Sequence, residues 1–357
     1  MKKIIAIGFI CIAAGALMFY LKPTDNQEKV ISPVAGGSIK PSPDISINQT
    51  LLFVPYWTID KSNIESSGYD GLVYFGIRPD INGIDVKDDG YKNMIQFLGK
   101  TSPKITQYVV IRFLDSTINF KILENKELQK KIIQEAINFA KENSFKGIVL
   151  DLEVSSLPFD SVVQEINNFT KDFYAEVSRN NLEFYIALYG DVFYRIRPYD
   201  VSILAKHTDG IFVMAYDFHK AKGNPGPSFP LSGKEIYGYD FKKMIEDYTK
   251  IIRKEKLIVV FGMFGYDWKI DDKNQPLKPG EPVSLLEIKN KFIDKCAMLD
   301  CSITRDEKST ESNITYTDKD NIKHVVWYED MDSIEKKKKF LKEEGINSTA
   351  FWAYSYF

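Results

Sequence analysis

Two carboxylates, Asp151 and Glu153, end a short apolar stretch at residues 146–153, KGIVLDLE. Alternate residues of a strand face the same side, so both side chains would project from one face, with Cα atoms about 6–7 Å apart. Two carboxylates this close do not ionise independently, because the charge of one raises the pKa of the other. One of them can therefore hold a proton near neutral pH and act as a general acid beside an anion. Structural salt bridges or a metal site are alternative roles for this short pattern.

The composition gives no support for a metal or for a nucleic acid. The three histidines, His207, His219 and His324, are isolated in sequence, and no cysteine spacing resembles a zinc site. We therefore expect no metal and no other cofactor. The formal net charge of −2 carries no basic excess, which disfavours nucleic acid as a partner.

Further polar and aromatic side chains stand at the ends of other apolar runs. Carboxylates among aromatic rings suit a sugar site, since acids handle the glycosidic oxygen and rings stack on the apolar faces of pyranose units. Core packing, loop caps and salt bridges are the alternative roles for these side chains. The candidates are Tyr56, Tyr216, Asp217, Tyr266 and Trp352.

Eight apolar or aromatic runs follow one another along the chain, and amphipathic segments lie between them. Segments such as 130–141, 162–173 and 241–252 have the i, i+3, i+4, i+7 spacing of helices packed on one side. Strands that alternate with helices imply a parallel sheet, and eight such units predict an α/β fold, a (β/α)8 TIM barrel, over 49–357. A doubly wound open sheet is the alternative, but no Gly-rich nucleotide loop follows any strand. The runs are 51–57, 71–77, 106–114, 147–153, 182–190, 209–217, 257–268 and 348–354.

Function in such a barrel lies at the carboxyl ends of the strands, where the candidate side chains would meet. Two longer segments are expected to shape that rim. One is a loop rich in Gly and Pro at 218–238. The other is a small α+β insertion at 269–330 after the seventh strand, with a helix near 283–299 and a strand at 325–330.

Cys296 and Cys301 lie five residues apart, in or just after the helix expected in the insertion. On one helix this spacing points the two side chains apart. Free, partly buried thiols are therefore expected in preference to a disulfide.

The N-terminus reads as an export signal. Lys2 and Lys3 precede an apolar run from Ile4 to Leu21, which is close to the length that spans a bilayer. We predict a signal-anchor or transmembrane helix at 1–22 and a flexible linker at 23–48, which is rich in Pro and Gly. A cleaved signal peptide is the alternative. Either leaves the barrel on the outer side of the membrane.

Several segments resemble glycoside hydrolase family 18, in the order expected for that family. KGIVLDLE resembles its DGxDxDxE signature, and MAYDFH (214–219), GMFGYDW (262–268) and AFWAY (350–354) resemble later strand motifs. Two more segments, GNPGPSFPL (223–231) and VVWYED (325–330), are similar to the bacterial N-acetylglucosaminidase branch that acts on cell walls and spore cortex. The resemblance covers about residues 50–357.

The resemblance implies retaining hydrolysis of a polysaccharide that contains β-linked N-acetylglucosamine, such as peptidoglycan or a chitin-like chain. In this family the acetamido group of the substrate acts as the nucleophile. Glu153 matches the proton donor, Asp151 the acid that orients the acetamido group, and Tyr216 the phenol that hydrogen-bonds its oxygen. Trp352 matches the ring beneath the reacting sugar, and Asp217, Tyr56 and Tyr266 are further candidates for substrate contact.

Two positions depart from the signature, because Lys146 and Val149 stand where its first two acids are expected. A catalytically inactive, chitinase-like carbohydrate-binding protein on the same barrel is the alternative function, since a fold does not determine an activity. Retention of both Asp151 and Glu153 favours the enzyme.

Overall fold

The computed structural model describes residues 48–59, 63–296 and 301–357. The membrane segment expected at 1–22 and the linker expected at 23–48, apart from Asn48, lie outside these residues. Within the described ranges, no helix is long and apolar enough to cross a bilayer.

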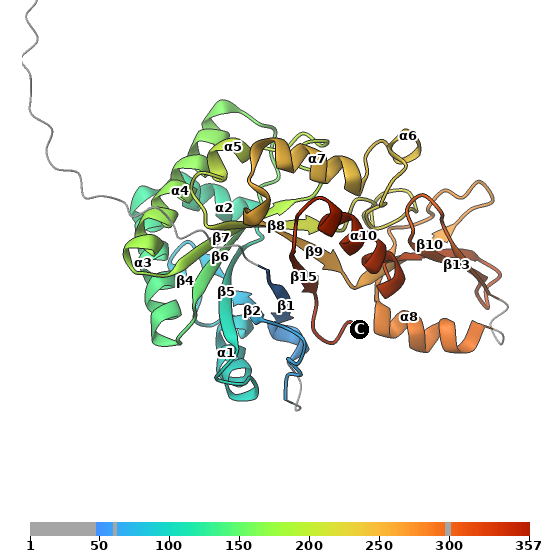
Figure 1. The fold of residues 1–357 in the computed structure, drawn as a ribbon, viewed down its shortest axis with the longest axis horizontal. Coiled ribbons are helices and arrows are strands. Elements are labelled where there is room, and N and C mark those ends of the chain that lie inside the picture. The colour runs from blue at the N-terminus through green and yellow to red at the C-terminus, as the bar shows by residue number, and fades with distance from the viewer. Residues whose placement is uncertain (1–47, 60–62, 297–300) are drawn as a thin grey trace, which may run out of the picture. The chain divides into compact units, whose positions relative to one another are not determined.

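Eight parallel strands close into a barrel (Figure 1). They pair in the order β1, β2, β5, β6, β7, β8, β9, β15, and β15 closes the barrel on β1. Each predicted apolar run supplies one of these strands, so the predicted barrel is confirmed and the open sheet is wrong. The bounds are β1 Thr50–Pro55, β2 Gly71–Ile77, β5 Thr106–Phe113, β6 Gly147–Leu152, β7 Glu183–Tyr189, β8 Gly210–Ala215, β9 Leu257–Gly262 and β15 Ser348–Trp352.

Helices connect the strands and bury their apolar stripes against the outside of the barrel (Figure 1). The stripes predicted at 130–141, 162–173 and 241–252 belong to α3, α4 and α7. Most of these helices begin after an Asp or Asn whose side chain accepts backbone N–H groups of the first turn, which satisfies donors that a helix leaves unpaired. The bounds are α1 Asp89–Lys100, α2 Ser116–Leu123, α3 Lys126–Glu142, α4 Asp160–Arg179, α5 Val201–Leu204, α7 Phe241–Ile251 and α10 Met331–Glu343.

The alternation of side chains along β6 decides where the acid pair points. Ile148 and Leu150 pack outward in the large cluster between strands and helices. Val149 belongs to the separate cluster that fills the barrel interior. Asp151 and Glu153 share the parity of Val149, so both project to the inside, at the carboxyl end of the strand. The same-face prediction for the two acids is therefore confirmed.

A small α+β insertion follows the seventh barrel strand, as predicted, but it begins earlier than expected. The run at 257–268 is two strands: β9 stays in the barrel, and β10 enters a separate antiparallel sheet of order β11-β10-β14-β13-β12. A continuous apolar run does not show this change of partner, because both strands are buried on at least one face. The elements are β10 Phe264–Ile270, β11 Glu281–Ser284, α8 Leu285–Lys291, β12 Ser302–Arg305, β13 Ser312–Thr317 and β14 Lys323–Tyr328.

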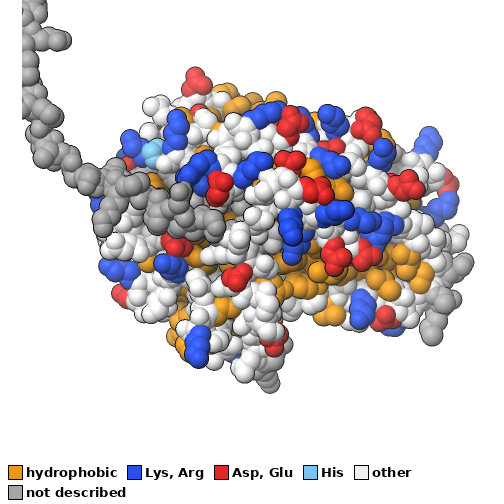
Figure 2. Space-filling model, in the orientation of Figure 1, with side chains coloured by type: hydrophobic (Ala, Val, Ile, Leu, Met, Phe, Trp, Pro, Cys, Tyr) orange, Lys and Arg blue, Asp and Glu red, His pale blue; other side chains and the backbone are white. Residues whose placement is uncertain are grey.

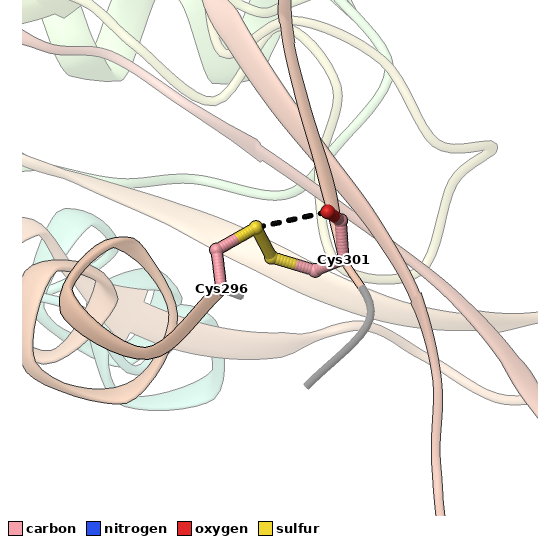
Figure 3. Close-up of a disulfide and its surroundings, with 2 residues drawn as sticks. All are labelled: Cys296 and Cys301. Atoms are coloured by element: carbon pink, nitrogen blue, oxygen red, sulfur yellow. Dashed lines mark hydrogen bonds between the residues drawn. A yellow bond between two sulfur atoms is a disulfide. The ribbon is translucent and has the colours of Figure 1, made fainter. Parts of the chain in front are cut away.

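Cys296 and Cys301 form a disulfide, with Cα atoms 5.1 Å apart (Figure 3). The expectation of free thiols was wrong, because it placed both cysteines on one helix. Helix α8 ends at Lys291, and Cys301 comes directly before strand β12. The two side chains therefore approach from different elements, at a separation within the usual range for a disulfide.

Short elements complete the described chain. Basic and acidic side chains are interspersed over the face shown in Figure 2, as the near-neutral composition leads one to expect. The short elements are β3 Pro79–Asp80, β4 Gly83–Ile84 and α6 Lys234–Tyr237, with single 3-10 turns at Tyr56–Thr58, Lys254–Lys256 and Ile293–Lys295.

Candidate functional site

A cavity of about 260 Å³ opens at the carboxyl ends of the barrel strands. Its walls combine four carboxylates, two cations and several aromatic rings. Most of the lining residues end a barrel strand or follow one within a few residues, which is where α/β barrels place their chemistry. The lining residues are Trp57, Phe75, Leu114, Asp151, Glu153, Tyr189, Gly190, Asp191, Arg197, Met214, Tyr216, Asp217, Lys220, Phe264 and Trp352.

Asp151 is a buried acid with an unused acceptor. Its side chain is 5% exposed, and Oδ1 has no hydrogen-bond partner among the described residues. Burial first, and the charge of Glu153 second, raise the pKa of the Asp151 carboxyl well above its ordinary value. Asp151 therefore holds its proton more readily than an exposed Asp, and Oδ1 is free to accept a donor from a bound molecule.

Glu153 stands at the cavity on a firmly held backbone. Its N–H donates to the Phe113 carbonyl at 2.9 Å, and its carbonyl accepts from the Asn119 amide at 2.7 Å. On either side, the Tyr199 hydroxyl donates to the Leu152 carbonyl and accepts from the Val154 N–H, both at 2.8 Å. This bracing fixes the direction in which the carboxylate enters the cavity, which a proton donor requires.

Tyr216 and Asp217 follow β8 and reach the same cavity. Burial, and next the charge of Asp151, raise the pKa of the Tyr216 phenol well above its ordinary value, so the phenol remains a hydrogen-bond donor. Asp217 has a left-handed backbone, with φ of 59°. Its Oδ1 accepts the Tyr266 hydroxyl at 2.8 Å, and burial raises its pKa more than this bond lowers it.

Trp352 ends β15 and lines the cavity. Its ring is held edge to face by Phe75, with centroids 4.8 Å apart, and is flanked by Phe53 and Trp57 at 5.6 and 6.2 Å. Rings in such a cluster have little freedom to rotate. The cluster thus presents Trp352 as a fixed apolar wall beside the acid pair.

The structure does not bring Tyr56 and Tyr266 into the cavity wall. Tyr56 lies under the Arg112 guanidinium, 5.0 Å from the ring centroid, and its neighbour Trp57, which is 50% exposed, lines the cavity instead. Tyr266 belongs to insertion strand β10 and acts on the site through its bond to Asp217. The Arg112 guanidinium in turn pairs with Asp88 at 2.5 Å.

Three lining residues at or after the end of β7 were not selected from the sequence, namely Tyr189, Asp191 and Arg197. Arg197 lies 3.6 Å over the Tyr189 ring and pairs with Asp191 at 2.6 Å. Both carboxylate oxygens of Asp191 are in ion pairs, because Arg197 pairs with Oδ1 and Arg195 pairs with Oδ2 at 2.7 Å. Applying the strand-end rule to the run at 182–190 would have found Tyr189 and Asp191, whereas Arg197 reaches the site only through the tertiary fold.

The two departures from the family signature lie away from the cavity wall. Lys146 precedes β6 at the opposite end of the barrel and pairs with Glu183 at 3.3 Å. Val149 lies in the barrel interior, where it lines a void of about 20 Å³ that Asp151 also borders. Among the described residues, no group of three or more His, Cys, Asp or Glu side chains is arranged to hold a metal ion.

A closed parallel barrel with an acid pair and aromatic walls at its carboxyl rim places this chain among the α/β-barrel proteins that carry a candidate acid–base site there. The sequence profile of Glycosyl hydrolases family 18 matches residues 52–356, so this chain belongs to that family of glycoside hydrolases.

Individual relatives agree with this membership. An uncharacterized glycosylase, YvbX, of Bacillus subtilis is 23% identical over 244 residues, covering 67% of this chain and 66% of the relative. The chain spans 66% of the length of YvbX and between 33% and 51% of the length of four further Bacillus relatives, which are a sporulation-specific glycosylase and cortical fragment-lytic enzymes.

Solved structures share the fold. The spore cortex-lytic enzyme SleL of Bacillus cereus has a TM-score of 0.67 at 19% identity, covering 87% of this chain and 71% of that one. A Group IV chitinase of Ostrinia furnacalis, solved with allosamidin, has a TM-score of 0.72 at 16% identity, covering 85% and 91%.

Proposed function

We propose that this chain hydrolyses β-linked N-acetylglucosamine bonds in peptidoglycan or a chitin-like polysaccharide, with retention and with the substrate's acetamido group as nucleophile. The observation that carries the proposal is the pairing of Glu153 at the cavity with a buried Asp151 whose Oδ1 has no partner among the described residues. The acetamido N–H of a bound sugar would supply the hydrogen-bond donor that Asp151 Oδ1 lacks.

The other cavity carboxylates are poorly placed to act as an enzyme nucleophile. Asp191 is neutralised by Arg195 and Arg197, and Asp217 accepts the Tyr266 hydroxyl. Asp151 is buried and holds its proton readily, which makes it a weak nucleophile. A nucleophile supplied by the substrate removes the need for a second exposed carboxylate.

The reaction then proceeds in two steps. The two acids share one proton, which Asp151 holds in the free protein and which passes to Glu153 when the acetamido N–H donates to Asp151 and so favours its ionised form. Glu153 gives this proton to the glycosidic oxygen while the acetamido oxygen bonds to C1, and the C1–O bond to the leaving sugar breaks. Asp151 accepts the acetamido N–H and stabilises the developing oxazolinium charge, while the Tyr216 hydroxyl donates to the acetamido oxygen before it attacks. Water next adds to C1, Glu153 takes its proton, and the oxazolinium ring opens to the product with its configuration retained.

Two further features support a polymeric substrate. A second hollow of about 490 Å³ adjoins the cavity through Leu114 and is lined by polar residues such as Arg78, Asp115 and Ser155. Exposed Trp57 offers an apolar face at the cavity edge. A cortex-lytic enzyme and a chitinase are among the proteins with this fold, which supports both substrate classes.

The decisive experiment compares wild type with Glu153→Gln on purified peptidoglycan and on chitin oligomers, with product masses as the readout. Wild type should release fragments with new reducing ends from at least one polymer, and Glu153→Gln should release none while still binding the oligomer. Glu127→Gln, at an exposed helix position 84% accessible, is the matched control and should keep full activity. Equal turnover by Glu153→Gln and wild type would refute the role of the acid.

A binding protein without turnover is the second candidate, and Val149 is the observation that favours it. The void beside Asp151 is lined largely by apolar side chains where the family signature has a further acid. On this reading, wild type and Glu153→Gln bind chitin oligomers equally and neither releases product. Inhibition of wild-type turnover by a thiazoline analogue of the oxazoline would rule this reading out.

We further propose that the barrel acts outside the cytoplasm, held by an N-terminal membrane segment at 1–22 or released by its cleavage. The apolar run after Lys2 and Lys3 supports this location, and so does the polymeric wall material proposed as substrate. The Cys296–Cys301 disulfide is also typical of an oxidising compartment.

A further inference from the structure

The loop after β8 brings two side chains to the cavity and is held in place largely by the insertion. This segment, residues 217–232, is called here the β8 loop. Asp217 and Lys220 line the cavity. A loop of this length, with three prolines and two glycines, has few hydrogen bonds of its own, so external contacts must fix its shape.

The insertion holds the early part of the β8 loop through strand β10 and through Gly280, which directly precedes β11. The Ala221 carbonyl accepts the Gly280 N–H at 2.8 Å and the Trp268 indole N–H at 3.2 Å. Tyr266, two residues before Trp268, donates to Asp217. These contacts place one side of the loop beside the cavity.

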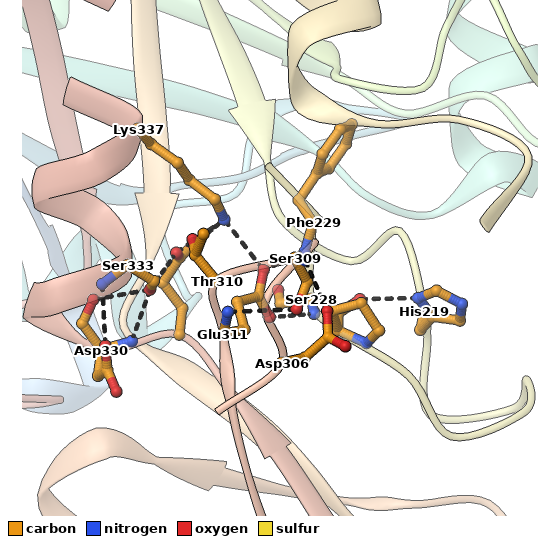
Figure 4. A network of polar contacts seen from close by, with 12 residues as sticks. His219, Ser228, Phe229, Asp306, Ser309, Thr310, Glu311, Asp330, Ser333 and Lys337 are labelled. Atoms are coloured by element: carbon orange, nitrogen blue, oxygen red, sulfur yellow. Dashed lines mark hydrogen bonds and ion pairs between the residues drawn. The ribbon is translucent and has the colours of Figure 1, made fainter. Parts of the chain in front are cut away.

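Glu311 holds the later part of the β8 loop through the hydrogen bonds drawn in Figure 4. Its side chain is 0% exposed. One carboxylate oxygen accepts the Ser228 N–H at 2.5 Å, and the other accepts the Phe229 N–H at 2.8 Å. Ser228 in turn accepts the Phe218 N–H on its carbonyl at 2.7 Å, and its hydroxyl accepts the Asp217 N–H at 3.4 Å. A short chain of bonds thus leads from Glu311 to the cavity residue Asp217.

Glu311 belongs to a fully buried charge cluster with Lys337 and Glu329. The Lys337 ammonium lies 2.9 Å from Glu311 and 2.7 Å from Glu329, and all three side chains are 0% exposed. Glu329 accepts the Ser333 hydroxyl at 2.7 Å and has no hydrogen bond to the β8 loop. The cluster therefore contains two carboxylates with one cation, but only one of the carboxylates binds the loop.

Stability alone does not account for such a cluster. Apolar side chains of similar volume would usually stabilise a buried position as well or better, because burying charges carries a desolvation cost. What a carboxylate adds is geometry, since its two oxygens accept two successive N–H groups at defined angles. That arrangement fixes the backbone at residues 228–229 and, through Ser228, the turn at Asp217.

We propose that Glu311 is a positioning residue for the glycosidase reaction, which sets the β8 loop so that Asp217 and Lys220 face the cavity. The inference rests on the proposed function. It assigns the insertion a role in forming the active site, through Glu311 on one side and Tyr266 on the other.

Glu311→Gln is the informative variant, with Glu329→Gln as its matched control. In Gln one carboxylate oxygen is replaced by an NH2 group, so one of the Ser228 and Phe229 N–H groups would face a donor in place of its acceptor, while Lys337 stays paired with Glu329. Because a shift of about 1 Å at a site can cost about 10²-fold, we expect Glu311→Gln to lower kcat/KM by about 10-fold to 10²-fold. Glu329→Gln makes the same chemical change in the same cluster but leaves the loop bonds, so its kcat/KM should remain within about 3-fold of wild type.

A double-mutant cycle separates positioning from a general loss of structure. In an Asp217→Asn background, Glu311→Gln should cost much less than it does alone, because the two residues act through one turn. Equal losses for Glu311→Gln and Glu329→Gln, or full additivity with Asp217→Asn, would overturn the proposal.

Hydrogen exchange gives a readout that does not depend on turnover. Amides of residues 217–232 should exchange faster in Glu311→Gln than in wild type, and those of Glu329→Gln should not. Unchanged exchange in Glu311→Gln would refute the positioning role whether or not wild type is active. A wild type without turnover, but with the expected exchange difference, would instead refute the proposed function and retain the role of Glu311 in setting the loop.

Discussion

The buried acid Asp151 should make the stability of this protein fall as pH rises, and Asp151→Asn should remove that fall. Asp151 is 5% exposed, lies beside Glu153, and has an Oδ1 without a partner among the described residues. Burial and the charge of Glu153 raise its pKa well above the ordinary 3.8. Asn has nearly the same shape as Asp and never ionises, so the substitution isolates the titration.

The sign of this change in stability with pH follows from how many protons the folded and unfolded states bind. Above about pH 5 the unfolded chain has lost the Asp151 proton, while the folded chain still holds it, so the folded state binds one more proton. Wild-type stability therefore falls by about 1.4 kcal/mol for each pH unit until the folded carboxyl itself ionises. The difference in unfolding free energy, Asp151→Asn minus wild type, should rise by that slope and then level off at the folded pKa.

Urea unfolding of both proteins, followed by circular dichroism at half-unit steps from pH 4.5 to pH 9, measures this difference directly. Asp172→Asn, on an exposed position of α4, is the control and should change stability by less than about 0.5 kcal/mol at every pH. In parallel, Asp151→Asn should lower kcat by about 10²-fold or more, as for other lost transition-state contacts.

A stability difference that stays constant across this pH range would refute the argument, because it would mean that Asp151 titrates alike in the folded and unfolded states. A variant that is less stable at pH 8 than at pH 5, relative to wild type, would show that the folded protein binds the ionised form instead. Either result would also remove the reason for excluding Asp151 as a direct nucleophile.

Two further predictions concern the buried cluster and the N-terminus. Burial first, and the charge of Glu311, raise the pKa of Glu329 from 4.5 to about 7, against the opposing effect of Lys337. Wild-type stability should therefore fall as pH rises from about 4.5 to about 7. Over that window the unfolding free energy of Glu329→Gln minus that of wild type should grow by on the order of 3 kcal/mol, measured by the same unfolding series. A difference that stays constant with pH would show that Glu329 keeps its ordinary pKa. Protease added to intact bacterial cells that express the full chain should digest the barrel. The mass of the protein purified from untreated cells should show whether residues 1–22 remain. A barrel that resists protease until the cells are broken would refute the proposed location outside the cytoplasm.

Much of the fold could be predicted because the signal is local. Each barrel strand is a continuous apolar run, and α3, α4 and α7 show the helical stripe, so eight strands and their order follow from spacing. The boundary at Gly262 could not be predicted in this way. The chain there exchanges barrel partners for the insertion sheet without any change in apolar character.

The residues of the candidate site also differ in how far the sequence predicts them. Asp151, Glu153, Tyr216, Asp217 and Trp352 end strands or follow them directly, so the strand-end rule found them and the fold brings them to one cavity. Tyr56 and Trp57 are neighbours with similar local patterns, and only the turn at Tyr56–Thr58 decides that Trp57 faces the cavity.

The sequence by itself determined the barrel, the parity that turns Asp151 and Glu153 inward, and the family to which the chain belongs. These properties depend on spacing along one strand or on motifs a few residues long. The tertiary structure decided the Cys296–Cys301 disulfide, the pairing of Arg197 with Asp191, and the bond chain from Glu311 to Asp217. Ser228 and Glu311 are 83 residues apart, and no local pattern of either residue encodes which partner the closed barrel will place within hydrogen-bond distance.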